Sequence, residues 1–203
     1  MPFPPARERF ERLEEAIQLM RAMWSGGPVR YDGRYYRVDG VDLQPKPATR
    51  MPLVIGGSGE QRTLRVVARY AGEWNSVGLS AKDLARKNEV LARHCEAERR
   101  DPNAIRRSMM NFAMVGPDER FRLMVAERLS KMPRRGEALS AEQTVLRGPE
   151  LGMIGGTTQQ VVDQLGELSR LGLEEVMFQH LFYERDEVPE YLAREIIPKV
   201  RDL

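Results

Sequence analysis

The sequence is nearly free of cysteine, with Cys95 as the single example among 203 residues. An internal disulfide is therefore excluded, and because Cys95 lies in a helical pattern we expect it to pack in the interior. No run of about 18 apolar residues is present, and the first residues have no apolar segment of a signal peptide. We therefore expect a cytoplasmic protein with no membrane partner.

Histidine is scarce as well, with two residues. No spacing of His, Cys, Asp or Glu is typical of a metal site, and no nucleophile motif such as Gly-x-Ser-x-Gly occurs. His180 follows the last predicted strand, where barrel enzymes carry catalytic groups, but an exposed or structural histidine is an alternative interpretation. The sequence thus predicts no metal ion and leaves the catalytic residues unknown.

An excess of charge of one sign is also missing, because 32 basic residues face 30 acidic ones and the net charge is +2. The arginines alternate with glutamates along helical patterns instead of collecting on one face, which argues against nucleic acid as a partner. Hydrophobic residues make up 41% of the chain, enough to fill a core. We expect one domain over residues 1–203.

The most informative stretch is an apolar strand at 52–55 that ends in a glycine turn and leads into a helical pattern at 60–71. We expect the strand to be buried on both faces, as in a parallel sheet. Gly56, Gly57 and Gly59 can adopt positive φ and approach a ligand, and Ser58 adds a hydroxyl. This order predicts an anion site for a cofactor phosphate at a helix N-terminus, although an ordinary strand-to-helix turn has the same pattern.

Strands and helices alternate along the rest of the chain. Further strands are predicted at about 72–77, 108–115 and 175–179, and helices at about 6–24, 80–100, 117–131, 158–171 and 187–200, with Ser80 and Thr157 as N-caps. Residues 132–152 read as a loop insertion with one short helix at 141–147. The alternation predicts an α/β fold with a parallel sheet, either a barrel or an open sheet.

A β-hairpin is predicted at 29–38, because Asp32-Gly33-Arg34 separates two β-prone segments. We expect a tight turn with positive φ at Gly33. The hairpin would be a decoration outside the core that covers the end of a sheet.

Several segments, spread in order over nearly the whole chain, resemble one known family. They are Pro2-Phe3-Pro4-Pro5, Arg9-Phe10-x-Arg12-Leu13-Glu14-Glu15-Ala16, Asp32-Gly33-Arg34-Tyr35-Tyr36, Gln44-Pro45-Lys46-Pro47, Ile55-Gly56-Gly57-Ser58-Gly59, Arg62-Thr63-Leu64-Arg65, Ala68-Arg69-Tyr70-Ala71-Gly72-x-Trp74-Asn75 and Gly156-Thr157-x-x-Gln160-Val161. Together they resemble the luciferase-like monooxygenase superfamily, and within it the bacterial oxidoreductases that use the deazaflavin coenzyme F420.

The resemblance implies a fold and a set of cofactor contacts. The family fold is a TIM (β/α)8 barrel, and this chain looks like its C-terminal half, strands five to eight, with the small hairpin added. In the family, the glycine turn lies against the phosphate-bearing tail of the cofactor, which implies this role for Gly56, Gly57, Ser58 and Gly59. Asn75 and Ser80, near the top of the next strand, and Thr157, at a second helix N-terminus, are weaker candidates.

The resemblance also implies a function. It suggests hydride transfer or monooxygenation of a small organic substrate, with coenzyme F420 as cofactor and FMN as the alternative. A half-barrel would need a partner, either a second copy or a complementing N-terminal half. The alternative is an inactive barrel fragment that acts as a structural or assembly partner.

Overall fold

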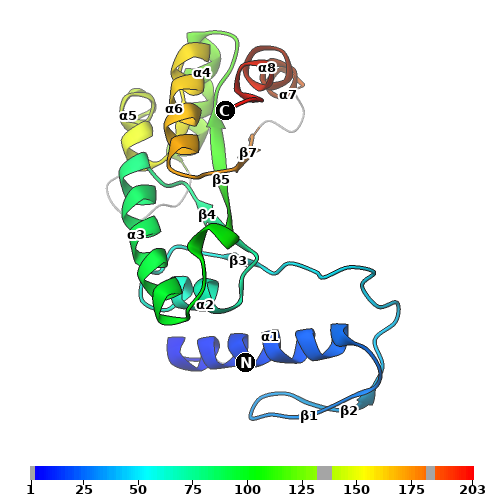
Figure 1. Cartoon of the computed structure of the whole chain (residues 1–203). Coiled ribbons are helices and arrows are strands. Elements are labelled where there is room, and N and C mark those ends of the chain that lie inside the picture. The colour runs from blue at the N-terminus through cyan, green and yellow to red at the C-terminus, as the bar shows by residue number, and fades with distance from the viewer. Residues whose placement is uncertain (1–2, 132–138, 182–185) are drawn as a thin grey trace.

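A computed structural model describes residues 3–131, 139–181 and 186–203, which form two sheets and a set of helices (Figure 1). The elements are α1 (Ala6–Ser25), β1 (Val29–Asp32), β2 (Arg37–Val41), β3 (Val54–Gly56), α2 (Thr63–Tyr70), β4 (Glu73–Val77), α3 (Ala81–Ala97), β5 (Arg106–Met114), α4 (Glu119–Ser130), α5 (Ala141–Arg147), β6 (Ile154–Gly155), α6 (Thr158–Arg170), β7 (Glu175–Gln179), α7 (Glu187–Tyr191) and α8 (Ile197–Val200). Short 3-10 helices at Pro102–Ala104 and Pro149–Leu151 and a π-helical turn at Leu192–Ile196 connect some of them.

The larger sheet is parallel throughout. β4 pairs with β3 on one side and β5 on the other, and β7 pairs with β5. The predicted α/β class with a parallel sheet is therefore confirmed. A fifth strand, β6, pairs with the last residues of β5 and was not predicted, because two residues are too few for a strand pattern in the sequence.

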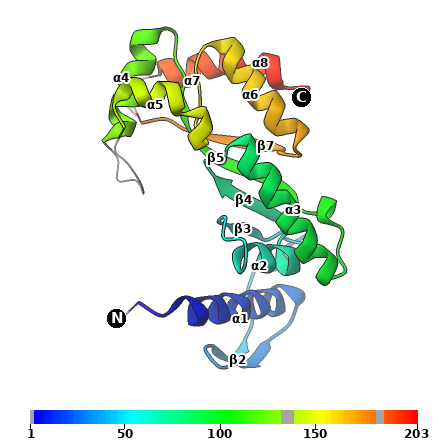
Figure 2. The ribbon, with the colours of Figure 1, turned by 90° about the vertical axis from the view of Figure 1, so that its left-hand side faces the viewer.

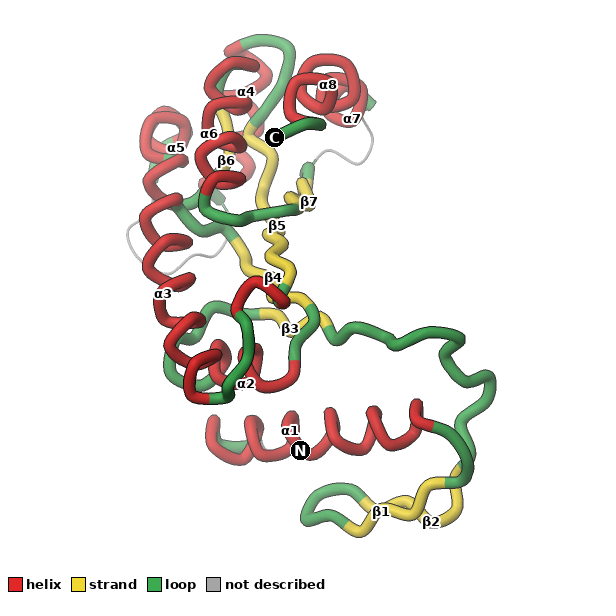
Figure 3. The backbone as a smooth tube through the Cα atoms, viewed as in Figure 1, coloured by secondary structure: helices red, strands yellow, loops and turns green. Residues whose placement is uncertain are grey.

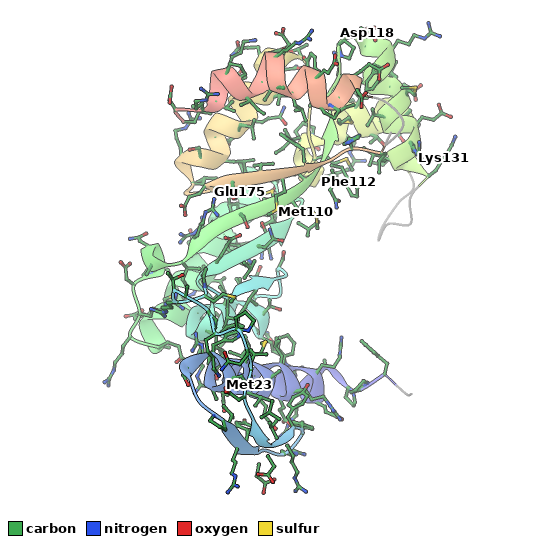
Figure 4. All side chains as sticks on the ribbon, turned by 90° about the vertical axis from the view of Figure 1, so that its right-hand side faces the viewer. Met23, Met110, Phe112, Asp118, Lys131 and Glu175 are labelled. Carbon is green, nitrogen blue, oxygen red and sulfur yellow. The ribbon has the colours of Figure 1, made fainter. Side chains whose placement is uncertain are left out.

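Helices cover one face of this sheet and leave the other open. Ile55, Trp74 and Met109 point to the covered face and are 7%, 1% and 0% exposed. Figure 2 shows α3 and α6 running along that side of the strands, and Figure 4 views the opposite side, with Met110 and Phe112 of β5 labelled. Apolar residues also lie on the uncovered face of the sheet.

One prediction about the burial of this sheet was wrong. The strand at 52–55 was expected to be buried on both faces, but Val54 is 58% exposed. The reason is that none of the described helices covers this face of the sheet, on which Val77 of the central strand β4 is likewise 50% exposed. An apolar run in the sequence does not show whether helices cover one face of a sheet or both.

Helix starts follow the predicted caps, with one exception. The Ser80 hydroxyl accepts a hydrogen bond from the Asp83 amide at the start of α3, and Thr157 forms a reciprocal capping box with Gln160 at the start of α6. Helix α5 occupies the predicted 141–147, while residues 132–138 of the predicted loop insertion lie outside the described residues. Helix α2, expected from residue 60, begins only at Thr63.

The hairpin formed by β1 and β2 packs against α1. The Tyr35 hydroxyl donates to a carboxylate oxygen of Glu11 at 2.5 Å, and one oxygen of Glu15 accepts from the amides of Tyr35 and Tyr36, both at 2.9 Å. In Figure 1, α1 lies between this hairpin and α2. The expectation that the hairpin covers the end of a sheet was therefore wrong, because its polar contacts are with α1.

Gly33 is required for a different reason from the predicted one. Its φ is not positive, but a Cβ atom there would lie 2.0 Å from Oε1 of Glu15 and 2.6 Å from Cε1 of Tyr31. The residue is thus a glycine because the Glu15 carboxylate approaches its backbone.

We expect Gly33→Ala to lower the free energy of unfolding by about 1 to 3 kcal/mol, since the new methyl group displaces Glu15 from two amides. Urea denaturation measures this loss. The same substitution in a Glu15→Ala background provides the control, because the collision with the carboxylate is removed there and only the one with the Tyr31 ring remains. An equal loss in both backgrounds would contradict the explanation.

Candidate functional site

The turn Gly56–Gly59 lies at the carboxyl end of β3, beside β4. The Gly57 amide donates to the carbonyl oxygen of Asn75 at 3.0 Å, which continues the pairing of the two strands. Gly57 has a φ of +117°, a region that favours glycine, whereas Gly56 and Gly59 do not have positive φ. The expectation of positive φ at all three glycines is thus correct only for Gly57.

Three backbone amides that follow Gly57 are available to a ligand. In residues 3–131, 139–181 and 186–203, no protein acceptor pairs with the amides of Ser58, Gly59 and Glu60. Consecutive free amides are the type of group that binds anions in proteins. Because α2 begins three residues after Glu60, these amides, rather than the N-terminus of the helix, would receive the anion.

Trp74 fixes the turn to the sheet. Its Nε1 atom donates to the carbonyl oxygen of Gly57 at 2.7 Å, and the side chain is 1% exposed. The indole ring is therefore a buried packing group that also satisfies one turn carbonyl, not a ring available for stacking on a ligand.

Helix α3 holds the turn from behind. Lys87 donates from Nζ to the Ser58 carbonyl oxygen at 2.8 Å and to Oε1 of Glu60 at 3.1 Å. His94 lies 2.8 Å from the Glu60 carbonyl oxygen through Nε2, and because a carbonyl can only accept, Nε2 carries the proton. Two side chains, two turns of helix apart, thus bind consecutive parts of the turn.

Sequence reasoning missed Lys87, although a signal was present. Lys87 is only 8% exposed and stands on the buried stripe of α3 between Leu84 and Leu91. A lysine on an apolar stripe needs polar partners, because burial of an unpaired ammonium is costly. Only the folded chain reveals that these partners are in the glycine turn.

The charges around the turn are balanced by a short network. The hydrogen bond from Lys87 lowers the pKa of Glu60, and Arg86 lowers it further. Arg86 also pairs with Asp83 at 2.9 Å, and this contact, followed by the Ser80 hydroxyl, lowers the pKa of Asp83. Glu60 is therefore ionised at neutral pH, and its charge is balanced by Lys87 and Arg86.

This network predicts a pH dependence of stability. Because folding lowers the pKa of Glu60, the stabilisation is present above the ordinary value of 4.5 and is lost as the pH falls through the lower folded value. We expect Glu60→Gln to lower the melting temperature by a few degrees at pH 7 and to leave it almost unchanged near pH 3. Thermal unfolding at both pH values tests this.

The exposed Glu96 on α3 is the matched control, since it has no side-chain partner in the described part of the chain. Glu96→Gln should leave the melting temperature unchanged at both pH values. A loss at pH 3 as large as that at pH 7 would show that Glu60 acts through its shape and not through its charge.

The sequence-predicted residues fall into two groups. Asn75 lies directly beside Gly57 and its Nδ2 donates to the Ser108 hydroxyl at 2.9 Å, while Ser80 is connected to the turn through Asp83, Arg86 and Glu60. Thr157 caps α6, and no hydrogen bond among the described residues joins it to the turn. The structure therefore brings together Gly56–Gly59, Asn75 and, indirectly, Ser80.

The remaining expectations concern His180, Cys95, metal binding and membrane-spanning helices. His180 follows β7 directly and is half-buried, and no described contact assigns it a catalytic role. Cys95 is 0% exposed, as expected for a packing residue, and burial raises the pKa of its thiol. Within the described ranges no cluster of three or more His, Cys, Asp or Glu side chains is arranged to hold a metal ion, and none of the described helices is long and apolar enough to cross a membrane.

Comparison with known proteins adds to this geometry. Residues 3–175 match the family model described as luciferase-like monooxygenase. The F420-dependent hydroxymycolic acid dehydrogenase of Mycobacterium tuberculosis is 34% identical over 113 residues, which cover 56% of this chain and 31% of the relative. The F420-dependent glucose-6-phosphate dehydrogenase of Mycolicibacterium smegmatis is 26% identical over 223 residues, covering 99% of this chain and 64% of the relative.

Among solved structures, an F420-dependent secondary alcohol dehydrogenase in complex with an F420-acetone adduct has a TM-score of 0.73 and 18% identity. The match covers 99% of this chain and 64% of that protein. This likeness shows a shared fold along the chain. In each of these comparisons the chain spans less than two thirds of the length of the protein it matches.

Proposed function

The chain belongs to the luciferase-like monooxygenase family, and from this premise we propose that it is the cofactor-phosphate side of an F420-dependent oxidoreductase. Gly56, Gly57, Ser58 and Gly59 would hold the phosphate of the cofactor, with Asn75 and Ser80 nearby and Thr157 as an outer candidate. The observation that carries the proposal is the set of free amides at Ser58, Gly59 and Glu60 on a turn fixed by Trp74 and Lys87. FMN, which also carries a phosphate, is the alternative cofactor.

The residues present fit such a phosphate. Three consecutive amides would donate hydrogen bonds to an anion, and space is open at Gly56, where a Cβ atom would have only the Asn75 carbonyl oxygen, at 4.0 Å, in its neighbourhood. The nearest acid, Glu60, is neutralised by Lys87 and Arg86. When bound, the deazaflavin or flavin supplies hydride chemistry. The chain's own residues bind and orient its phosphate end.

The reaction would be hydride transfer to or from a small organic substrate, or its monooxygenation. Relatives named for F420-dependent dehydrogenation favour the first of these. A fluorescence titration of residues 1–203 with coenzyme F420, and separately with FMN, tests the proposal. Saturable binding of F420 supports the proposal. Binding of FMN but not of F420 would identify FMN as the cofactor, and binding of neither would contradict the proposal.

A second candidate function rests on a different observation. Val54, Val77 and Met177 on the open face of the sheet are 58%, 50% and 38% exposed, and β3 and β7 each pair with one strand only. We propose that residues 1–203 form the C-terminal half of a (β/α)8 barrel and associate through this face. Strands β3, β4, β5 and β7 from two copies would together form a closed eight-stranded barrel. A complementing N-terminal half would close the barrel in the same way.

A further inference from the structure

A cavity of about 840 Å³ lies at the opposite end of the sheet from the glycine turn. Its lining residues come from α1, from the segment that leads into β3, from the end of α2 and from the segments before β4 and β5; they include Arg21, Trp24, Arg50, Arg69, Tyr70 and Arg100. Four of them are arginines and none is acidic. Figure 3 shows the long loop that leads from β2 to β3, at whose end Arg50 lies.

Three of the four guanidinium groups have no carboxylate partner. Arg69 pairs with Glu14 at 3.2 Å and with Glu98 at 3.7 Å. Arg21, Arg50 and Arg100 form no salt bridge within the described parts of the chain. The cavity therefore carries an uncompensated positive charge, which focuses a positive potential between its walls.

A structural role explains part of this cluster. Arg21 donates from Nη2 to the Tyr70 carbonyl oxygen at 2.7 Å, and Arg100 donates to the carbonyl oxygens of Ala68, at 3.0 Å, and Ala71. These oxygens end α2, so both arginines satisfy and complement a helix C-terminus.

Helix capping leaves most of the donors unused. A guanidinium has five N–H donors, and the carbonyls of α2 take one from Arg21 and two from Arg100. The exposed Arg50 forms no hydrogen bond or ion pair with the described residues. Three separate segments thus bring arginine side chains with unused donors to the wall of one cavity.

We propose that this arginine cavity binds a small polyvalent oxyanion. Planar guanidinium groups match the paired oxygens of phosphate and carboxylate groups, and a polyvalent anion can engage several of them at once. Trp24 in the wall offers apolar surface to the remainder of an organic anion, whereas the Tyr70 ring is 7% exposed and is already covered by Arg21 and Arg69. Phosphate and carboxylate ligands share this chemistry.

The cavity is separate from the glycine turn. Met51 and Leu53 precede β3, whereas Gly57 follows it, so the two sites lie at the amino and carboxyl ends of the same strand. A ligand of the cavity is therefore an addition to the cofactor proposed above, and each site can be tested while the other is intact.

The test is isothermal titration calorimetry of residues 1–203 at low ionic strength, with pyrophosphate as the phosphate probe and tricarballylate as the carboxylate probe. We expect one-to-one binding that weakens with added salt. Arg50→Ala should weaken it about tenfold, because one charge-assisted hydrogen-bonding group is lost. Arg50 is the residue to change, since it forms no hydrogen bond or ion pair with the described residues and its removal leaves α2 capped.

Two further variants make the result specific. Arg93→Ala removes the same charge from an exposed position on α3 outside the cavity, and it should bind both probes as the parent chain does. Gly57→Val should retain binding as well. Absence of binding to the parent chain, equal weakening in the Arg50 and Arg93 variants, or loss of binding in the Gly57 variant would each overturn the proposal.

Discussion

Replacing Gly57 by valine is expected to weaken the binding of coenzyme F420 to residues 1–203 by about a hundredfold or more, equivalent to about 2.7 kcal/mol. A β-branched residue does not tolerate the φ of +117° found here. Its Cβ would also lie 3.2 Å from Cγ2 of Thr63. The turn would have to rotate, and the free amides of Ser58 and Gly59 would no longer converge on one anion.

Gly26 is a suitable control position, because its φ is close to that of Gly57. Gly26, after α1, has a φ of +120°, and a Cβ atom there meets nothing within 4 Å. Gly26→Val therefore introduces similar backbone strain away from the turn. Fluorescence titration should give parental affinity for the Gly26 variant and a large loss for the Gly57 variant. Unchanged affinity in the Gly57 variant, with its circular dichroism spectrum intact, would remove the glycine turn from the cofactor site.

Features that depend on neighbouring residues in the sequence were predicted well. Ser80 and Thr157 cap α3 and α6 because a hydroxyl reaches an amide three residues ahead, and this requires no tertiary contact. The alternation of strands and helices, and hence the parallel sheet, follows from such local patterns.

Features that depend on contacts between distant segments were not predicted. Gly33 is a glycine because Glu15 of α1 approaches it, and Lys87 is buried because Ser58 and Glu60 supply its partners. The exposure of Val54 depends on which face of the sheet the helices cover. A local sequence pattern contains no information on these pairings, so the supporting residues of the candidate site emerged only with the fold.

The open face of the sheet leads to the second large prediction, that purified residues 1–203 will self-associate unless a complementing half is supplied. Val77 at the end of β4 and Met177 of β7 align across β5 through Met110. They form a partly exposed apolar row across the open face of a sheet whose edge strands, β3 and β7, each pair with one described strand only. Surfaces and edges of this kind drive association.

Val77→Glu separates association from folding. In a monomer Val77 is 50% exposed, so the charge should change the free energy of unfolding by no more than about 0.5 kcal/mol. In an assembly closed over this face the carboxylate would be buried, and we expect the dissociation constant to rise at least about a hundredfold. Light scattering over a range of concentrations measures this, with Val41→Glu as the control, because Val41 is 45% exposed in the hairpin and outside the parallel sheet. A parent chain that remains monomeric at every concentration, or an assembly that tolerates glutamate at Val77 as well as at Val41, would contradict closure through this face.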